Sequence, residues 1–207
     1  IFNYIPYVQT NFVLGLDSDE GDEPFELTKK FVDLTPAAFP GYSLLSAFGE
    51  AAPQNLEYQK TNRVLPFPFH FLNNHLAMNV KPKNYEWIEF YDKVISLTSY
   101  SFSKKALYRR FKATPNFTSR WMNFMRAISS EGYGRLKFYH QVRKNLVEDK
   151  NFRKYFEGES VKLPEFYTNI IKSTLGKWWE WLPNGAVEHN PNAYLEKHLK
   201  RNSAATV

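Results

Sequence analysis

The sequence predicts an α/β segment over residues 1–83 followed by a mostly α-helical region over residues 84–207. Two observations support this fold class. The first part places short apolar runs on either side of one helical repeat, which is the pattern of a βαβ unit. From residue 84 onward, apolar residues recur at spacings of three and four, as amphipathic helices require. The chain has 207 residues, of which 43% are hydrophobic, and is long enough to bury a core.

The βαβ unit is expected to begin with an apolar strand over residues 9–16. A continuous apolar run suits a strand of a parallel sheet that is covered on both faces. Pro24 predicts the start of the following helix, and Pro40-Gly41 predict the turn after it. The second strand is expected over residues 42–48, and the connection between the two strands should be right-handed.

The remaining elements follow from proline positions and apolar spacing. Pro66 and Pro68 predict extended structure over residues 66–71, because two prolines at this spacing disrupt a regular helix. Residues 202–207 are expected to fray. The other expected elements are a helix at 54–61, a short strand at 77–80, and helices within 84–95, 114–128, 136–146, 164–182 and 193–201.

Composition excludes several classes of function. The chain has no cysteine, which excludes disulfides and thiolate metal ligands within it. It has no apolar run of about twenty residues and no recognisable signal peptide, so we expect no membrane span and a cytoplasmic location. The charge is uneven. Residues 1–60 hold three bases and nine acids, and the remainder holds 24 bases and 12 acids, which indicates two regions with different surfaces.

The acidic loop over residues 17–23 has two interpretations. Its carboxylates offer many oxygens to a cation, but the loop lacks the glycine and glutamate spacing of a helix–loop–helix calcium site. We favour a solvated turn whose acids stabilise the start of the next helix.

The five histidines show no zinc-ligand spacing, and no serine lies in a nucleophile elbow. These histidines are His70, His75, His140, His189 and His198.

The basic run over residues 104–112 mixes cations with aromatic residues. Such a mixture can bind a nucleic-acid backbone and stack bases. We favour an amphipathic helix in which Leu107, Tyr108 and Phe111 pack inward while the basic side chains remain in water. The aromatic residues near Trp121 and Trp178 are expected to belong to the core or to an interface.

Three segments together resemble the radical S-adenosylmethionine (SAM) enzymes that carry an N-terminal cobalamin-binding domain. The segment FVLGLD at residues 12–17 resembles the fifth strand of their barrel, and PGYSLLSAFG at 40–49 resembles the sixth. MNVKPKNY at residues 78–85 resembles the end of that barrel. The resemblance implies the last strands of a partial (β/α)6 barrel, followed by a C-terminal helical region that extends over most of the chain.

The resemblance also implies a set of cofactor-binding residues. In this family a fifth-strand motif supports the SAM adenine. Aligned on this chain, the motif falls on Asn11, Val13 and Gly15, with Asp17 in the acidic role. Ser46 and Phe48, in the segment that resembles the sixth strand, complete the implied site. Asn11 departs from the family motif, which has glycine there, and Asp17 lies one position early.

The family binds a [4Fe–4S] cluster through three closely spaced cysteines, and this chain has none. We therefore expect the cluster loop, the first strands and a cobalamin-binding domain in a missing N-terminal part of the same protein. Alone, the chain is expected to be inactive and to expose the edge of the strand at residues 9–16. The parent enzyme is expected to act on an apolar small-molecule substrate and not on nucleic acid. The alternative is a non-enzymatic helical module whose basic face binds nucleic acid or an acidic protein.

Overall fold

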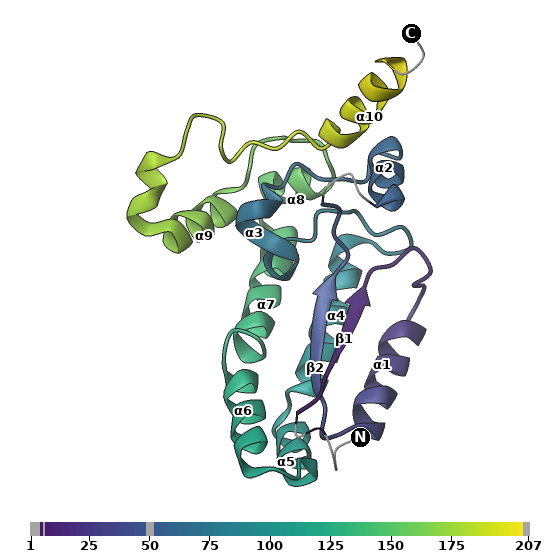
Figure 1. The fold of residues 1–207 in the computed structure, drawn as a ribbon, viewed down its shortest axis with the longest axis vertical. Coiled ribbons are helices and arrows are strands. Elements are labelled where there is room, and N and C mark those ends of the chain that lie inside the picture. Colours follow the sequence, from purple (N-terminus) through teal and green to yellow (C-terminus); the bar gives the residue numbers. More distant parts are fainter. Residues whose placement is uncertain (1–4, 6, 49–51, 205–207) are drawn as a thin grey trace. The chain divides into compact units, whose positions relative to one another are not determined.

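The computed structural model describes residue 5 and residues 7–48 and 52–204. The described chain is mostly helical, with one small sheet of two parallel strands (Figure 1). The expected combination of α/β and α structure is confirmed at this level. No helix in the described ranges is long and apolar enough to cross a membrane.

The elements, in chain order, are β1 (Gln9–Leu14), α1 (Glu23–Leu34), β2 (Phe39–Leu44), α2 (Pro53–Lys60), α3 (Phe69–Leu76), α4 (Trp87–Ser101), α5 (Lys104–Ala113), α6 (Phe117–Ile128), α7 (Tyr133–Glu148), α8 (Lys150–Phe156), α9 (Glu165–Leu175), the 3₁₀ helix η1 (Gly176–Trp181) and α10 (Ala193–Ala204).

The chain divides into two compact units, each made of two segments. Unit 1 contains residues 1–43 and 82–148, and unit 2 contains residues 44–81 and 149–207. The change between residues 81 and 82 lies close to the boundary expected at residues 83 and 84. The helices that follow it are shared between the two units, so the division is not a simple split into an N-terminal and a C-terminal half.

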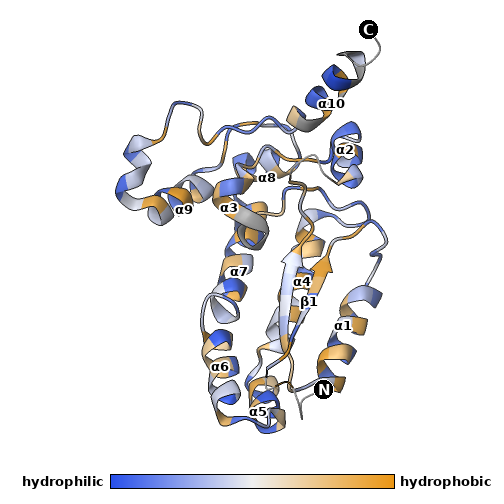
Figure 2. Cartoon of the chain, in the orientation of Figure 1, coloured by the Kyte–Doolittle hydropathy of each residue, from blue (hydrophilic) through white to orange (hydrophobic). Residues whose placement is uncertain are grey.

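Unit 1 packs one face of the sheet against α1 and α4. Phe12 on β1 contacts the ring of Phe31 on α1, with ring centroids 5.4 Å apart. On β2, the buried hydroxyl of Tyr42 lies 2.6 Å from the hydroxyl of Ser101 on α4. Helix α4 also packs along α7, where Tyr139 is fully buried. The apolar residues of β1 are those of its C-terminal half, residues 12–14, and its arrow is orange in Figure 2.

The second strand begins earlier than predicted, and Pro40-Gly41 lie inside it and do not form a turn. The reason is the pairing register. Phe39 N–H donates to Val8 C=O at 2.9 Å, so the groups of Phe39 point toward the first strand. The backbone groups of Pro40 point to the outer edge of the sheet. Because no strand of the described chain pairs with that edge, the missing N–H of proline removes no hydrogen bond between strands. On the same edge the guanidinium of Arg135 donates to Tyr42 C=O at 2.6 Å.

Unit 2 is built around an aromatic core centred on Phe67. Its ring is fully buried and contacts Tyr155 and Tyr167, with ring centroids 4.9 Å away in each case. The Tyr155 hydroxyl donates to Pro66 C=O at 2.6 Å. The proline-rich segment supplies this core and forms no helix before Phe69, as two closely spaced prolines predict. It is not an extended strand, because Phe67 N–H donates to Leu65 C=O and Phe69 N–H donates to Phe67 C=O, each at 2.8 Å, which makes two tight turns.

Two other predicted elements differ in extent. Helix α3 starts at Phe69, so the prediction of extended structure is wrong for residues 69–71. Pro68 C=O accepts from Phe71 N–H at 2.9 Å, and a proline just before a helix needs no N–H partner. The strand expected at residues 77–80 is reduced to one antiparallel bridge between Val64 and Val80.

Candidate functional sites

Asn11 and Val13 lie on the uncovered face of the sheet, on the opposite side of β1 from the face that contacts α1. The Asn11 side chain is exposed, and Val13 is 48% exposed. The Gln9 amide donates to Asn11 Oδ1 at 2.5 Å. A sheet covered on both faces was expected from the apolar run. That expectation is wrong within the described residues, because the residues at odd positions of β1 remain accessible.

Gly41 on β2 allows these amides to lie against the sheet. A Cβ atom at this position would come within 2.5 Å of Asn11 Oδ1 and 2.9 Å of the Gln9 amide nitrogen. The uncovered face therefore presents amide groups and one apolar side chain, close to the backbone of β2. Amides both donate and accept hydrogen bonds, so this surface can match the edge of a flat polar ring.

The turn after β1 is held by Asp19. Its carboxylate accepts hydrogen bonds from the N–H groups of Gly15 and Leu16, both at 3.0 Å, and the residue is 9% exposed. Gly15 has a φ of 87°, a region that favours glycine. Asp17 is exposed at the start of the turn. The prediction of a solvated turn is correct for most of the loop but wrong for Asp19, which is a buried structural acceptor.

Residues far along the chain close the same turn. The Asn84 amide donates to Asp17 C=O at 3.1 Å and to Asp19 C=O at 2.9 Å. Burial, together with nearby carboxylates, raises the pKa of Tyr85 to about 12, and its neutral hydroxyl donates to Gly21 C=O at 3.1 Å. The loop carbonyls are thus bound within the protein, which favours a structural turn over a cation site.

Ser46 and Phe48, the other two predicted SAM-binding residues, lie in unit 2. The Ser46 hydroxyl donates to Leu44 C=O at 3.1 Å, and Phe48, 60% exposed, stacks on Phe69 with ring centroids 5.2 Å apart. The structure therefore places four of the predicted residues in one unit and two in the other.

Asn79, which was not predicted as a site residue, fixes this second group. Its buried amide accepts from Ala47 N–H at 2.8 Å and donates to Ala47 C=O at 2.7 Å. One side chain thus replaces a strand partner for the segment that carries Ser46 and Phe48. The signal was present in the sequence, since Asn79 lies within the MNV motif, but its role depends on a residue 32 positions earlier.

Helix α5 presents other side chains to the core than those predicted. Arg110 is 2% exposed, whereas Tyr108, which was expected to pack inward, is 63% exposed. The Arg110 guanidinium donates to Ala38 C=O at 3.2 Å and to Ser101 C=O at 3.1 Å. Burial lowers the pKa of Arg110 to about 10. The physical reason is that the carbonyls of Ala38 and Ser101 are buried and each needs a donor. An inward tyrosine has one hydroxyl proton and could not donate to both carbonyls.

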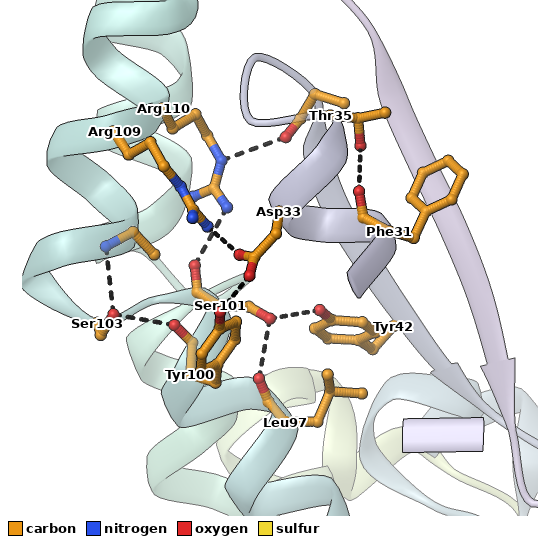
Figure 3. Close-up of polar contacts among 12 residues, drawn as sticks. Phe31, Asp33, Thr35, Tyr42, Leu97, Tyr100, Ser101, Ser103, Arg109 and Arg110 are labelled. Atoms are coloured by element: carbon orange, nitrogen blue, oxygen red, sulfur yellow. Dashed lines mark hydrogen bonds and ion pairs between the residues drawn. The ribbon is translucent and has the colours of Figure 1, made fainter. Parts of the chain in front are cut away.

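The neighbouring Arg109 stays at the surface and forms an ion pair with Asp33. The same carboxylate accepts from the Tyr100 hydroxyl at 2.6 Å, so Asp33 lies between two donors (Figure 3). The hydrogen bond from Tyr100 and the adjacent Arg109 hold the pKa of Asp33 below its usual value. Two consecutive arginines therefore have opposite environments.

Helix α6 has an inverted arrangement of side chains. Its buried residues are Ser119, Asn123 and Ala127, which recur every four positions. Large apolar side chains face outward instead, with exposed fractions between 37% and 67%: Phe117, Trp121, Met122, Phe124, Met125 and Ile128. The aromatic residues near Trp121 were expected in the core or at an interface. In the described chain they lie on an exposed surface. Apolar and polar residues are interspersed along α5 and α6 (Figure 2).

An apolar groove of about 320 Å³ lies between α5 and α6. The Phe111 and Trp121 rings meet edge to face there, with centroids 6.2 Å apart. Six residues line the groove: Lys104, Leu107, Tyr108, Phe111, Trp121 and Phe124. The sequence signal for this surface was the number of apolar residues on α6, because they occupy more of its circumference than one buried stripe needs.

A second groove, of about 470 Å³, lies between α1 and α4, and seven of its nine lining residues are polar or charged. Its charges are matched within the protein. Lys93 contacts Asp22 at 2.5 Å and Glu89 at 3.4 Å, and Lys29 contacts Glu26 at 2.7 Å. The hydrogen bond from Lys93 and the charge of its ammonium lower the pKa of Asp22. The matched charges favour a structural role for the groove.

The histidines do not form a metal site in the described part of the chain, where no group of three or more His, Asp and Glu side chains could hold a metal ion. The side chains of His75 and His198 lie outside the described part. Burial first, and the nearby His70 second, lower the pKa of His189.

Comparisons with known proteins found no match for this chain: no family model, no curated protein and no solved structure is similar to it at a significant level.

Proposed function

We propose that this chain forms the SAM-holding end of the barrel of a radical SAM enzyme of the cobalamin-binding type, together with the helical region that follows. One observation supports this proposal most directly. The two parallel strands leave one face accessible, with Asn11 and Val13 upon it. Parallel sheets are almost always covered on both faces, so an accessible face suits a ligand or a further segment.

The residues on this face fit the adenine end of SAM. The Asn11 amide offers a donor and an acceptor to the ring edge, and Val13 offers an apolar contact to the ring face. The Gly15 N–H is already bound to Asp19, so Gly15 contributes its unusual backbone conformation and not a hydrogen bond. Asp17 keeps the acidic role that the resemblance implies. Bound SAM supplies the radical chemistry, and these residues bind and orient it.

The chain does not fit an iron–sulfur cluster. It contains no cysteine, so it offers no thiolate ligand, and no catalytic step can be derived through the cluster here. The proposal assigns the cluster and the cobalamin to an N-terminal part of the same protein in the cytoplasm, and to this chain a cover for an apolar small-molecule substrate.

The test measures SAM binding by equilibrium dialysis with the protein purified anaerobically in the longest form in which it occurs. Val13→Lys places a charge and a long side chain on the uncovered face, and we expect affinity for SAM to fall about tenfold or more. The matched control is Leu34→Lys, because Leu34 is 82% exposed on α1 in the same unit and lies on a different surface. We expect the control to bind SAM as the unmodified protein does.

Two results would refute the proposal. One is a purified protein that holds no iron–sulfur cluster and does not bind SAM. The other is coding DNA upstream of the codon for Ile1 that lacks three closely spaced cysteine codons. Equal loss of SAM binding in the Val13 and Leu34 variants would contradict the placement of the adenine on this face.

A further inference from the structure

The exposed face of α5 and α6 combines apolar side chains with unmatched positive charge. From residue 93 to residue 130 the sequence contains eight basic residues and no acidic residue. Three of these bases pair with acids elsewhere in unit 1: Lys93, Arg109 and Arg126. Three others are exposed on α5 without an ion pair in the described chain: Lys104, Lys105 and Lys112.

The apolar part of this face is wide and belongs mainly to α6. Its outward residues extend from Phe124 through Phe117 and Trp121 to Met122, which is about 160° of the circumference at the 100° step of an α-helix. The inward side is held by polar contacts. The Asn123 amide donates to the Thr114 hydroxyl at 3.2 Å, and the Arg126 guanidinium lies 4.3 Å from the centroid of the Phe39 ring.

We propose that the α5–α6 face, defined by the outward residues of α6 and the three exposed lysines of α5, binds the surface of an anionic lipid bilayer. Helices that lie in a bilayer interface combine Trp, Phe and other apolar residues with lysine and arginine beside them. The apolar side chains of α6 would lie between headgroups and acyl chains, and the lysines would contact anionic headgroups.

Charge complementarity and the width of the apolar surface favour a bilayer. A partner helix docking in a groove contacts a narrow set of anchors at helical spacing. Here the groove accounts for only Trp121 and Phe124 of the outward residues of α6. The others, among them Met125 at 55% exposure, lie outside the groove and need a broad apolar partner. This inference is independent of the proposed SAM site.

The test is co-sedimentation of the protein with vesicles of phosphatidylcholine alone and of an equal mixture of phosphatidylcholine and phosphatidylglycerol. We expect binding to the anionic vesicles only, and weaker binding as salt rises above about 0.15 M. Replacement of both Trp121 and Met125 by glutamine should weaken partition at least about tenfold, because both side chains are expected to insert. Leu34→Gln, which removes an apolar side chain exposed on α1, should leave partition unchanged.

A second pair of variants tests the charges. The first replaces the three lysines of α5 by glutamine, and partition should fall roughly a hundredfold because each lysine near an anionic surface contributes about one kcal/mol. The matched control removes the same number of charges elsewhere in the chain by replacing three exposed lysines with glutamine: Lys137, Lys144 and Lys150.

Four outcomes would overturn the proposal. If the α5–α6 variants and their controls partition equally, another surface binds the lipid. If the protein binds phosphatidylcholine alone as strongly as the anionic mixture, the lysines have no part. If light scattering shows a dimer that the Trp121–Met125 variant loses, and no vesicle binding occurs, a second copy covers the face. Absence of both vesicle binding and self-association would favour an acidic protein instead.

Discussion

Asn79 provides the sharpest test of how unit 2 is held together. Its amide is fully buried and forms both of its described hydrogen bonds with one residue, Ala47, whose backbone is also buried. We consider Asn79→Leu, which keeps the approximate size of the side chain and removes its polar atoms. The variant leaves the N–H and the C=O of Ala47 without the partner that satisfies them.

The expected cost follows from these two groups. A buried polar group that loses its partner costs about 1–3 kcal/mol, so two such groups cost roughly 2–6 kcal/mol. The leucine side chain offsets about 1–2 kcal/mol of this by burying more apolar surface. The net loss in the free energy of unfolding should be about 1–4 kcal/mol. With a urea dependence of about 2 kcal/mol per molar, the unfolding midpoint should fall by about 0.5–2 M.

The assay is urea unfolding followed by tryptophan fluorescence and circular dichroism. The matched control is Asn169→Leu, the same substitution on the exposed side of α9 in the same unit. The free energy of unfolding of this control should change by less than about 0.5 kcal/mol. A loss below about 1 kcal/mol for Asn79→Leu, or equal losses in both variants, would refute the role assigned to this amide.

A second substitution separates the two hydrogen bonds by pH. In Asn79→Asp the ionised carboxylate can accept from Ala47 N–H but faces Ala47 C=O without a proton to donate. Burial and this repulsion should raise the pKa of the introduced carboxyl. Because its folded-state pKa would exceed its unfolded-state pKa, the variant should regain stability as the pH falls, measured relative to the unmodified protein. A deficit that is constant between about pH 7 and pH 4 would contradict this account.

Other predictions concern individual contacts. Asp19→Ala should lower the free energy of unfolding by about 2 kcal/mol, because two N–H groups lose a charged acceptor, while Glu20→Ala in the same turn should have little effect in the same urea assay. The pKa of Asp33 is lowered by the hydrogen bond from Tyr100. The stability difference between the protein and Asp33→Asn should therefore be fully present above the unfolded-state pKa of about 3.8 and vanish as the pH falls through the folded-state pKa. A difference that persists below the folded-state pKa would refute this prediction. The lowered pKa of His189 predicts that stability falls relative to His189→Gln as the pH drops through about 6.5, and parallel pH profiles of thermal unfolding would exclude this.

Proline positions and apolar spacing are local signals, so the sequence predicted the first strand, α1 and most of the later helices, but not α3 or α8. Helix α9 begins one residue after Pro164, where a helix start was expected, and α2 begins at Pro53, one residue before its expected start. The second strand was misplaced because the effect of Pro40 depends on which edge of the sheet it faces. That edge is determined by the pairing of Phe39 with Val8, which no local pattern reveals.

The candidate sites were harder to predict because they depend on contacts between distant segments. The accessible side of β1 carries Asn11 and Val13, two of the residues on which the family motif falls, and their role stays a prediction. The buried carboxylate of Asp19 was hidden within an acidic run. The predicted orientation of α5 was wrong because hydrophobicity alone favoured an inward Tyr108. Arg110 faces inward instead, because its guanidinium donates hydrogen bonds to the carbonyls of Ala38 and Ser101, which lie 72 and 9 residues earlier in the sequence.

The interleaved make-up of the two units has a consequence for synthesis and for dissection of the chain. Unit 1 is completed only when residues 82–148 have joined residues 1–43, and unit 2 only when residues 149–207 have joined residues 44–81. During translation the first segment of each unit must therefore wait for its complement, with apolar surface accessible to chaperones. A single cut at residue 83 would separate the sheet from α4 and α7, so neither product would contain an intact unit.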